Sequence, residues 1–323
     1  MRRFAREPAA GAPALDDSRP LAVAYSGGAD STALLLAACR LWPQRPIYAL
    51  HVHHGLQAAA GAFASHARQQ CLQWGVECRV LAARVRRRAG DSLEEQARLA
   101  RYAQLQRAAR ELGCGWLLLG HHADDQAETL LLALLRGAGP AGLAAMPQAV
   151  QRGAVWVGRP LLACSAESLR SELDAAGVVY LVDPMNAAPA LRRNRIRAEL
   201  LPVIARLEPG WRATLGRSAG LCAQAARQLR DSAASDLQLC RGAPGLQLRQ
   251  LLALEPARRS EVLRAWLLEL GLRSSSRQID NLCRQLQAPP HAAIGVSIAG
   301  ARLIRRDGWL CCQSALPSRP ATL

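Results

Sequence analysis

The chain has 323 residues, of which 50% are hydrophobic and 4% aromatic, a length that suffices for one large domain or two ordinary ones. All 41 basic residues are arginines, and the net charge of +16 favours a polyanionic partner such as nucleic acid, although a generally basic surface would give the same charge. No apolar run reaches the roughly 18 residues of a membrane span, and the ten cysteines form no CxxC pair, which predicts a cytoplasmic protein without membrane contact.

The first dense polar string, SGGADS at 26–31, lies between a short apolar run (21–25) and an apolar helix-like run (33–39). A strand, a glycine turn and a helix in this order point unpaired backbone N–H groups at an anion. The string has neither the lysine of the GxxxxGK[ST] loop nor the GxGxxG spacing, and an ordinary capped turn is the alternative. We predict phosphate binding, with Asp30 offering a carboxylate that could hold a magnesium ion against the phosphates. The predicted phosphate-binding residues are Ser26, Gly27, Gly28, Ala29, Asp30 and Ser31.

Strand and helix patterns then alternate as far as about residue 182. This alternation predicts an α/β fold, a parallel sheet with helices on both faces. Ligands bind such sheets at the carboxyl ends of the strands, so Ser26, His53 and His121 should meet in one cleft. Further strands are expected at 46–53, 78–85, 116–120, 156–162 and 178–182, and helices at 62–74, 93–112, 124–136 and 165–176.

A second polar cluster, 120–129, joins a buried strand to an apolar helix. If the cluster is helical, His121, Asp125 and Glu128 are spaced i, i+4 and i+7 and share one face. Such a face suits a cationic amine bound by the carboxylates, with the histidine in proton transfer. Two alternatives remain: a capping box of Asp125 and Glu128, and a metal site that includes His51 and His53.

Four arginines at 192–197, namely Arg192, Arg193, Arg195 and Arg197, are predicted to bind RNA phosphates, with a solvated helix face as the alternative. From there the pattern is mostly helical, with helices expected at 211–239, 258–270 and 276–286. A terminal hairpin is expected at 296–304 and 309–313 around an Asp-Gly turn. We therefore expect an N-terminal extension without a signal peptide (1–20), a catalytic domain (21–207) and a second, mostly helical RNA-contacting domain (211–323).

Six strings occur in an order that resembles the tRNA(Ile)-lysidine synthetase family, whose SGGADS-like loop is the PP-loop of the ATP pyrophosphatases. They are SGGADS (26–31), HVHHGL (51–56), ARLARY (97–102), GHHADDQAET (120–129), RPLL (159–162) and DPMN with RRNRIRAELLP (183–202). The resemblance implies a ligase that uses ATP, magnesium and free lysine to convert the wobble cytidine (position 34) of the CAU anticodon of tRNA(Ile) to lysidine. In the family, ATP adenylates the cytosine C2 oxygen and releases pyrophosphate, and the lysine side-chain amine then displaces AMP.

Carried onto this chain, the resemblance implies that residues 26–31 hold ATP and that Asp125 and Glu128 bind the lysine. Arg101 would stabilise charge at the reacting centre, and the arginines at 192–197 would contact the tRNA. The implied catalytic residues are Asp30, Arg101, His121, Asp125 and Glu128. The chain departs from the usual family pattern at His53, Gln57 and Met185, and it resembles the short form without an additional carboxyl-terminal domain. A homodimer is a further hypothesis.

Two other functions remain as alternatives. A PP-loop cytidine thiolase needs a persulfide or an iron–sulfur cluster held by paired cysteines, and the chain has no CxxC pair. A non-catalytic RNA-binding protein could keep the glycine loop as a relic, but we would then expect Asp30, Asp125 and Glu128 to have changed. We therefore favour the ligase.

Overall fold

The structure, a computed structural model, describes residues 1–7, 11–15, 18–53, 60–82, 93–182, 192–289 and 294–314. The sequence departures at Gln57 and Met185 lie outside these residues. The chain forms two compact units, Met1–Ala223 and Gln224–Leu323, and each is described by itself. The division falls inside the long helix α10 (Trp211–Cys240), beyond the boundary expected after residue 207.

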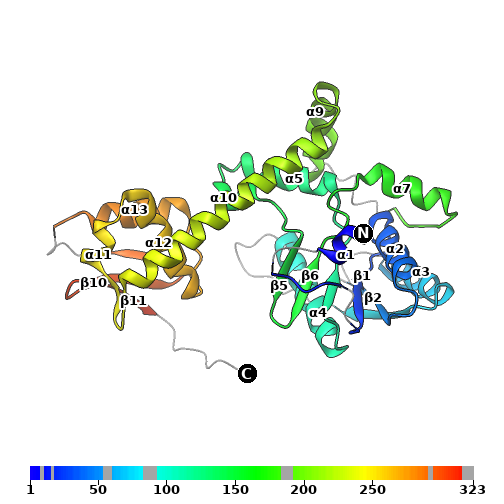
Figure 1. Cartoon of the computed structure of the whole chain (residues 1–323), viewed down its shortest axis with the longest axis horizontal. Helices are drawn as coiled ribbons and strands as arrows, with labels where there is room; N and C mark the ends of the chain where they lie inside the picture. The colour runs from blue at the N-terminus through cyan, green and yellow to red at the C-terminus, as the bar shows by residue number, and fades with distance from the viewer. Residues whose placement is uncertain are drawn as a thin grey trace. The chain divides into compact units, whose positions relative to one another are not determined.

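The first unit is built on a six-stranded sheet of order β3-β2-β1-β4-β6-β5 (Figure 1). All neighbouring strands are parallel except the edge strand β5, which is antiparallel to β6 and is not expected from the sequence. The chain proceeds outward from the centre in both directions, so the switch point at which ligands bind lies between β1 and β4. The strands are β1 (Leu21–Ala24), β2 (Ile47–His53), β3 (Glu77–Ala82), β4 (Trp116–Leu118), β5 (Ala149–Arg152) and β6 (Val155–Gly158).

Helices cover both faces of this sheet, as the sequence predicts. Leu21 and Val23 of β1 point to one face and pack in a core with residues of α1, α2, α3 and α7, whereas Ala22 points to the other face and packs with residues of α4. A central strand of a parallel sheet is buried on both faces, which explains why every residue of β1, with the sequence LAVA, is apolar. These helices are α1 (Arg2–Arg6), α2 (Ala29–Leu41), α3 (Ala60–Gln73), α4 (Leu93–Glu111) and α7 (Ala166–Ala175).

Two expected strands differ from the structure. The strand expected at 156–162 ends at Gly158, because Pro160 follows closely and has no N–H for a ladder. Residues 178–182 form no strand: Leu181 makes only an isolated bridge to Gly28, and its N–H donates to the Gly27 carbonyl oxygen at 2.9 Å. This bridge nevertheless ties the segment after α7 to the glycine loop.

A small core under the end of α5 (Ala123–Leu134) completes the first unit. Ala127 and Leu131 of α5 pack against Ile196, Leu201 and Trp211. These contacts hold the arginine-rich segment against α5. The segment comprises α8 (Arg192–Arg195), a π-helical turn (Ile196–Leu200) and α9 (Leu201–Leu207), and the short α6 (Pro140–Leu143) follows α5.

The second unit contains more sheet than the sequence predicts: five antiparallel strands of order β7-β8-β11-β10-β9. The Asp-Gly hairpin is confirmed, since Asp307 and Gly308 have φ of 48° and 79°, as a two-residue turn requires. The strand expected at 296–304 is two strands, because Ala299 and Gly300 also have positive φ and reverse the chain. The elements are β7 (Arg241–Gly242), β8 (Gly245–Gln247), α11 (Leu248–Ala253), α12 (Pro256–Glu269), α13 (Ser276–Leu286), β9 (Val296–Ile298), β10 (Ala301–Arg306) and β11 (Trp309–Ser314). Among the described residues, no helix is long and apolar enough to cross a membrane.

Candidate active site

The glycine loop between β1 and α2 is held from inside by two serine hydroxyls. Ser31 Oγ accepts the Ser26 N–H at 3.1 Å and donates to the Gly28 carbonyl oxygen at 3.0 Å. Ser26 Oγ lies 3.0 Å from Ser31 Oγ and accepts the Gly28 N–H at 3.3 Å. Gly27 has a φ of 86°, in the left-handed region that favours glycine. Ser26 and Ser31 therefore shape the loop and occupy the N–H groups of Ser26 and Gly28, so the N–H groups in the first turn of α2 are the donors for an anion.

The N-terminus of α2 is open at this loop. Its N-cap, Gly28, has no side chain to accept the first N–H groups of the helix, so these groups and the helix dipole favour an anion there. Gly120, two residues after β4, packs against the same turn, where a Cβ atom would lie 2.9 Å from the Asp30 carbonyl oxygen. The geometry is that of a phosphate-binding loop closed from behind by the end of β4.

Asp30 lies in the first turn of α2 and has one carboxylate oxygen without a partner. Its Oδ2 is 3.5 Å from His122 Nε2, whereas its buried Oδ1 makes no hydrogen bond. An unpaired carboxylate oxygen beside a phosphate-binding loop fits a magnesium ion, which is usually bound by one or two carboxylates together with substrate phosphates. The described residues contain no group of three or more His, Cys, Asp or Glu side chains that could hold a metal ion by themselves.

The junction of β4 and α5 differs from the predicted helix. The helix begins at Ala123, so His121 precedes it and does not share a face with Asp125 and Glu128. The residues in capping-box positions are instead His122 and Asp125: the His122 N–H donates to Asp125 Oδ2 at 3.2 Å, and the Asp125 N–H lies 3.4 Å from His122 Nδ1. The capping box expected at Asp125 and Glu128 is therefore wrong, because the capping positions lie three residues earlier in the chain.

His122 is the residue that the sequence analysis missed. Its buried ring lies 3.5 Å from Asp30, 3.6 Å from Asp124 and 3.4 Å from Asp125. Burial alone would lower its pKa, but the surrounding carboxylates raise the pKa to about 10, so the ring is an imidazolium at neutral pH. A protonated Nδ1 cannot accept the Asp125 N–H, so that 3.4 Å contact is a hydrogen bond only when the ring is neutral. His122 thus links the glycine loop to α5.

Asp124 joins three helices around this histidine. Its Oδ2 accepts the Ala166 N–H at the start of α7 at 2.9 Å, and its Oδ1 accepts Arg212 Nε of α10 at 2.9 Å. Burial would raise the pKa of Asp124, but the bonds from His122, Arg212 and Ala166 lower it well below its usual range. The first carboxylate of the Asp-Asp pair is therefore structural.

Glu128 is fully buried and binds two of the predicted RNA-binding arginines. Arg193 Nε donates to its Oε2 at 2.5 Å, and Arg197 Nε donates to its Oε1 at 2.6 Å. Arg193 also donates to Asp125 Oδ1 at 3.0 Å. Burial raises the pKa of Asp125, against the opposing charges of His122 and Arg193. The residues predicted for lysine and half of those predicted for tRNA thus form one ion-pair cluster.

The other predicted residues lie around this cluster. Arg192 and Arg195 are exposed, and Arg195 pairs with Glu199 on the surface at 3.1 Å. His121 follows β4 by three residues and has an unpaired Nδ1. Burial together with arginines, first Arg159 and then Arg101, lowers the pKa of His121 well below the usual range. His53 ends β2, on the far side of β1 and two strands from β4, roughly 10 Å away by strand spacing. The cleft expected from three strand ends is therefore built on β1 and β4.

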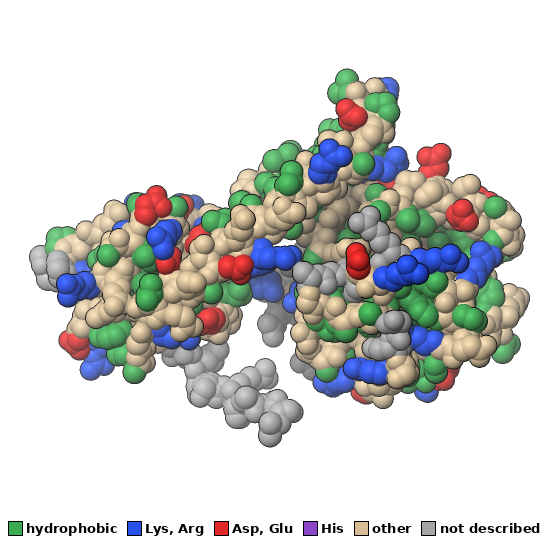
Figure 2. Space-filling model, viewed as in Figure 1, with side chains coloured by type: hydrophobic (Ala, Val, Ile, Leu, Met, Phe, Trp, Pro, Cys, Tyr) green, Lys and Arg blue, Asp and Glu red, His purple; other side chains and the backbone are tan. Residues whose placement is uncertain are grey.

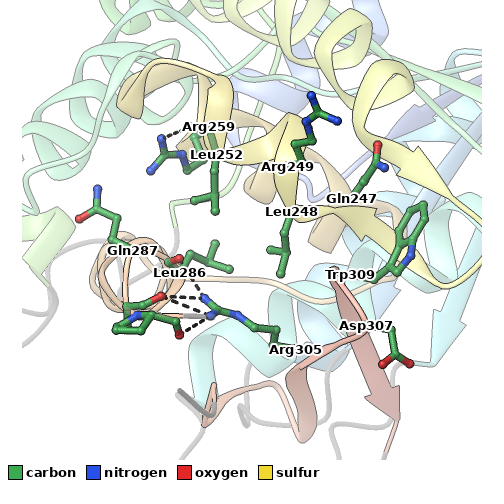
Figure 3. A pocket seen from close by; sticks show the side chains of 13 residues that line it. Gln247, Leu248, Arg249, Leu252, Arg259, Leu286, Gln287, Arg305, Asp307 and Trp309 are labelled. Carbon is green, nitrogen blue, oxygen red and sulfur yellow. Dashed lines mark hydrogen bonds between the residues drawn. The ribbon is translucent and has the colours of Figure 1, made fainter. Parts of the chain in front are cut away.

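The second unit contains a cavity of about 1050 Å³ between α11, α13 and the β10–β11 hairpin (Figure 3). Two arginines in its wall cap helices: Arg259 donates to the Leu254 carbonyl oxygen at 2.9 Å, and Arg305 donates to that of Leu286 at 3.0 Å. The Trp309 ring lies so close to Gly242 that a Cβ atom there would be 2.2 Å from it. No residue predicted for the active site lines this cavity.

Comparisons with known proteins agree with this architecture. A PP-loop domain model matches residues 3–204, and a TilS substrate binding domain model matches residues 246–311. The tRNA(Ile)-lysidine synthase of Polaromonas naphthalenivorans is 44% identical over 300 residues, which cover 92% of this chain and 90% of that protein. That of Alkalilimnicola ehrlichii is 46% identical over 258 residues, 79% of this chain but 57% of that protein.

A solved structure shares the fold of part of this chain. The U34-tRNA thiolase NcsA from Methanococcus maripaludis, determined with its [4Fe-4S] cluster, superposes with a TM-score of 0.56 at 18% identity. The match covers 65% of this chain and 74% of that one. At this identity the likeness concerns the fold alone. The matched models and the identity to relatives over most of the chain show that this protein belongs to the tRNA(Ile)-lysidine synthase family of PP-loop proteins.

Proposed function

We propose that the protein ligates lysine to C2 of cytidine 34 in the CAU anticodon of tRNA(Ile), using ATP. The observation that best supports this function is the His122 bridge. Its ring lies 3.5 Å from Asp30 at the phosphate-binding loop and 3.4 Å from Asp125 beside Glu128. A site for an anionic nucleotide and a site for a cationic amine are thereby joined through one side chain, as amine transfer to an ATP-activated group requires.

In this proposal the open N-terminus of α2 binds the phosphates of ATP, and Asp30 holds magnesium through its unpaired Oδ1. A magnesium ion held by Asp30 would supply positive charge that stabilises the departing pyrophosphate. Arg101 would stabilise the negative charge that develops at the reacting centre. Its positive charge is one of those that lower the pKa of His121 in the free protein. Adenylation makes the C2 oxygen of the cytosine a leaving group, so that AMP departs when the amine attacks.

The amine of lysine would compete with arginines for its carboxylates. Both Glu128 oxygens accept guanidinium N–H groups in the free protein. An incoming ammonium group therefore displaces part of this ion pairing, and the released arginine is then available to an RNA phosphate. Before attack the ammonium must lose a proton, and we assign its acceptance to His121, which the low pKa keeps neutral.

The RNA would be bound by arginines on both units. Figure 2 shows basic side chains spread over each unit on the face drawn. Exposed Arg192 and Arg195, next to the ion-pair cluster, are the predicted contacts nearest the reaction, and the second unit contributes through its TilS substrate binding domain. The cytoplasmic location and the homodimer stay predictions; light scattering of the purified protein tests the dimer.

The proposed order of chemistry is tested with ATP labelled at the α-phosphate and a tRNA(Ile) transcript carrying CAU. Without lysine, we expect label on the RNA and release of pyrophosphate; addition of lysine should convert the label to free AMP. Asp30→Ala should abolish both steps, whereas Asp231→Ala, at an exposed aspartate of α10, should change neither. Pyrophosphate release that is independent of RNA would contradict the proposal.

A further inference from the structure

Cationic and unpaired polar side chains gather at the ends of β4 and β6, on the face of the sheet that α4 covers. We call this group the cationic pocket; it consists of Arg98, Arg101, Tyr102, His121 and Arg159. The guanidinium carbons of Arg98 and Arg101 each lie 5.7 Å from the centre of the Tyr102 ring. Arg159 directly follows β6 and is only 7% exposed, with Nη1 donating to the Pro147 carbonyl oxygen at 2.9 Å.

Three polar atoms of this pocket are buried without a hydrogen-bond partner. They are Arg159 Nε, Tyr102 Oη and His121 Nδ1. Burial lowers the pKa of Arg159 and the nearby Tyr102 hydroxyl opposes this shift, but neither Tyr102 Oη nor Arg159 Nε makes a hydrogen bond of normal geometry. Buried polar groups are almost always paired, and each unpaired one is costly. Three in one pocket indicate that a ligand completes it.

The charges of the pocket define the chemistry of that ligand. The charged groups that act on His121 are Arg159, Arg101, Arg193 and Arg98, all positive. Within the part of the chain that the structure describes, only Arg193 of these four is paired with carboxylates, those of Asp125 and Glu128. Among the described side chains, no carboxylate forms a salt bridge with the other three arginines. Guanidinium forks, a hydroxyl and an imidazole are donors suited to the oxygens of a phosphate group.

We propose that the cationic pocket binds a phosphate group of the RNA backbone next to the reacting nucleotide, with Arg159 as its buried donor. Its position distinguishes it from the ATP site. The strand order β1-β4-β6 places Arg159 two strands from the glycine loop, roughly 10 Å away by strand spacing, and the pocket lies on the sheet face opposite α2. Enzymes that act on a base must hold its backbone while the base is unstacked. That the phosphate belongs to RNA rests on the proposed function.

A bound phosphate would also change the pKa of His121. The negative charge would offset the surrounding arginines and raise the pKa of His121 toward its ordinary value. RNA binding would then make His121 a stronger base at the time when the amine must be deprotonated. The pocket thus couples substrate binding to proton transfer.

Arg159→Gln tests the pocket, with Arg170→Gln as the matched control, since Arg170 is exposed on α7, which covers the opposite face of the sheet. Dissociation constants for a tRNA(Ile) transcript and for ATP are measured on the full chain at several salt concentrations. We expect Arg159→Gln to weaken RNA binding about tenfold or more and to reduce the slope of log K against log salt by about 0.7, with ATP binding unchanged. The control should match the wild type.

Tyr102→Phe keeps the test decisive if Arg159→Gln does not fold. The phenylalanine removes a buried, unpaired hydroxyl, so the free protein should be at least as stable as the wild type while its affinity for RNA falls about threefold. Unchanged RNA affinity in the variants would overturn the proposal, and weaker ATP binding with normal RNA binding would assign the phosphate to ATP instead. Because binding is measured without turnover, a protein that binds RNA through the pocket but transfers no lysine would overturn only the proposed function.

Discussion

The ion-pair cluster at Glu128 allows the effect of one substitution to be calculated from the structure. Glu128→Gln keeps the shape of the side chain but removes the charge that faces Arg193 and Arg197. Removing one partner of a buried ion pair costs about 3–5 kcal/mol. Because the Arg193 and Arg197 side chains are 28% and 41% exposed and keep part of their hydration, we expect the lower end of this range, about 3 kcal/mol. For a unit of this size the melting temperature should fall by about 6–12 °C.

Thermal unfolding followed by circular dichroism at pH 7 and low salt measures this change. Glu199→Gln is the control, since Glu199 pairs with Arg195 on the surface and both side chains are more than 60% exposed. The melting temperature of that variant should equal that of the wild type. In the double variant Glu128→Gln/Arg193→Gln the loss should be smaller than the sum of the single losses, because one unpaired charge is removed with its partner. A Glu128→Gln protein that melts within 1–2 °C of the wild type, about the effect of 0.5 kcal/mol, would refute the cluster's role.

Three further predictions concern the loop, the histidine and the arginines. Gly27→Ala, at a φ of 86°, should cost about 1–2 kcal/mol and weaken ATP binding, as measured by urea unfolding and equilibrium dialysis. The pKa of His122 is about 10 in the folded state and 6.5 when unperturbed, so its stabilisation is complete below pH 6.5 and is lost as the pH rises toward 10. Between pH 6 and pH 10 the wild type should therefore lose more free energy of unfolding in urea than His122→Gln. Arg192→Gln should reduce the slope of log K for RNA against log salt by about 0.7, in filter binding.

The sequence predicted the elements that depend on local patterns. The glycine loop could be predicted because its turn has a φ of 86° at Gly27, which only glycine adopts easily. Strands β1 and β4 could be predicted because each is a continuous apolar run. The Asp-Gly hairpin could be predicted because this dipeptide favours the positive φ values of a two-residue hairpin turn. Helices α2, α4 and α5 could also be predicted, because apolar residues recur in the sequence with the period of the helix face or strand that is buried.

The parts that were missed depend on single-residue positions or on contacts between distant segments. His122 was overlooked in favour of His121 because a pattern cannot locate a helix N-cap to one residue. The pairing of Glu128 with Arg193 and Arg197 joins residues 65 and 69 positions apart, and no local spacing contains it. The sheet of the second unit was underestimated because β7, β8 and β9 are two or three residues long.

The most direct test of the proposed activity is the incorporation of labelled lysine into RNA. Purified protein, ATP, magnesium and labelled lysine are incubated with a tRNA(Ile) transcript that carries CAU, and in parallel with a tRNA(Met) transcript that carries the same anticodon. We predict label in the first RNA alone, with one AMP and one pyrophosphate released for each lysine attached. Label in neither RNA, under conditions in which the protein binds both ATP and tRNA(Ile), would contradict the assignment of Asp125 and Glu128 to a lysine site and with it the proposed function.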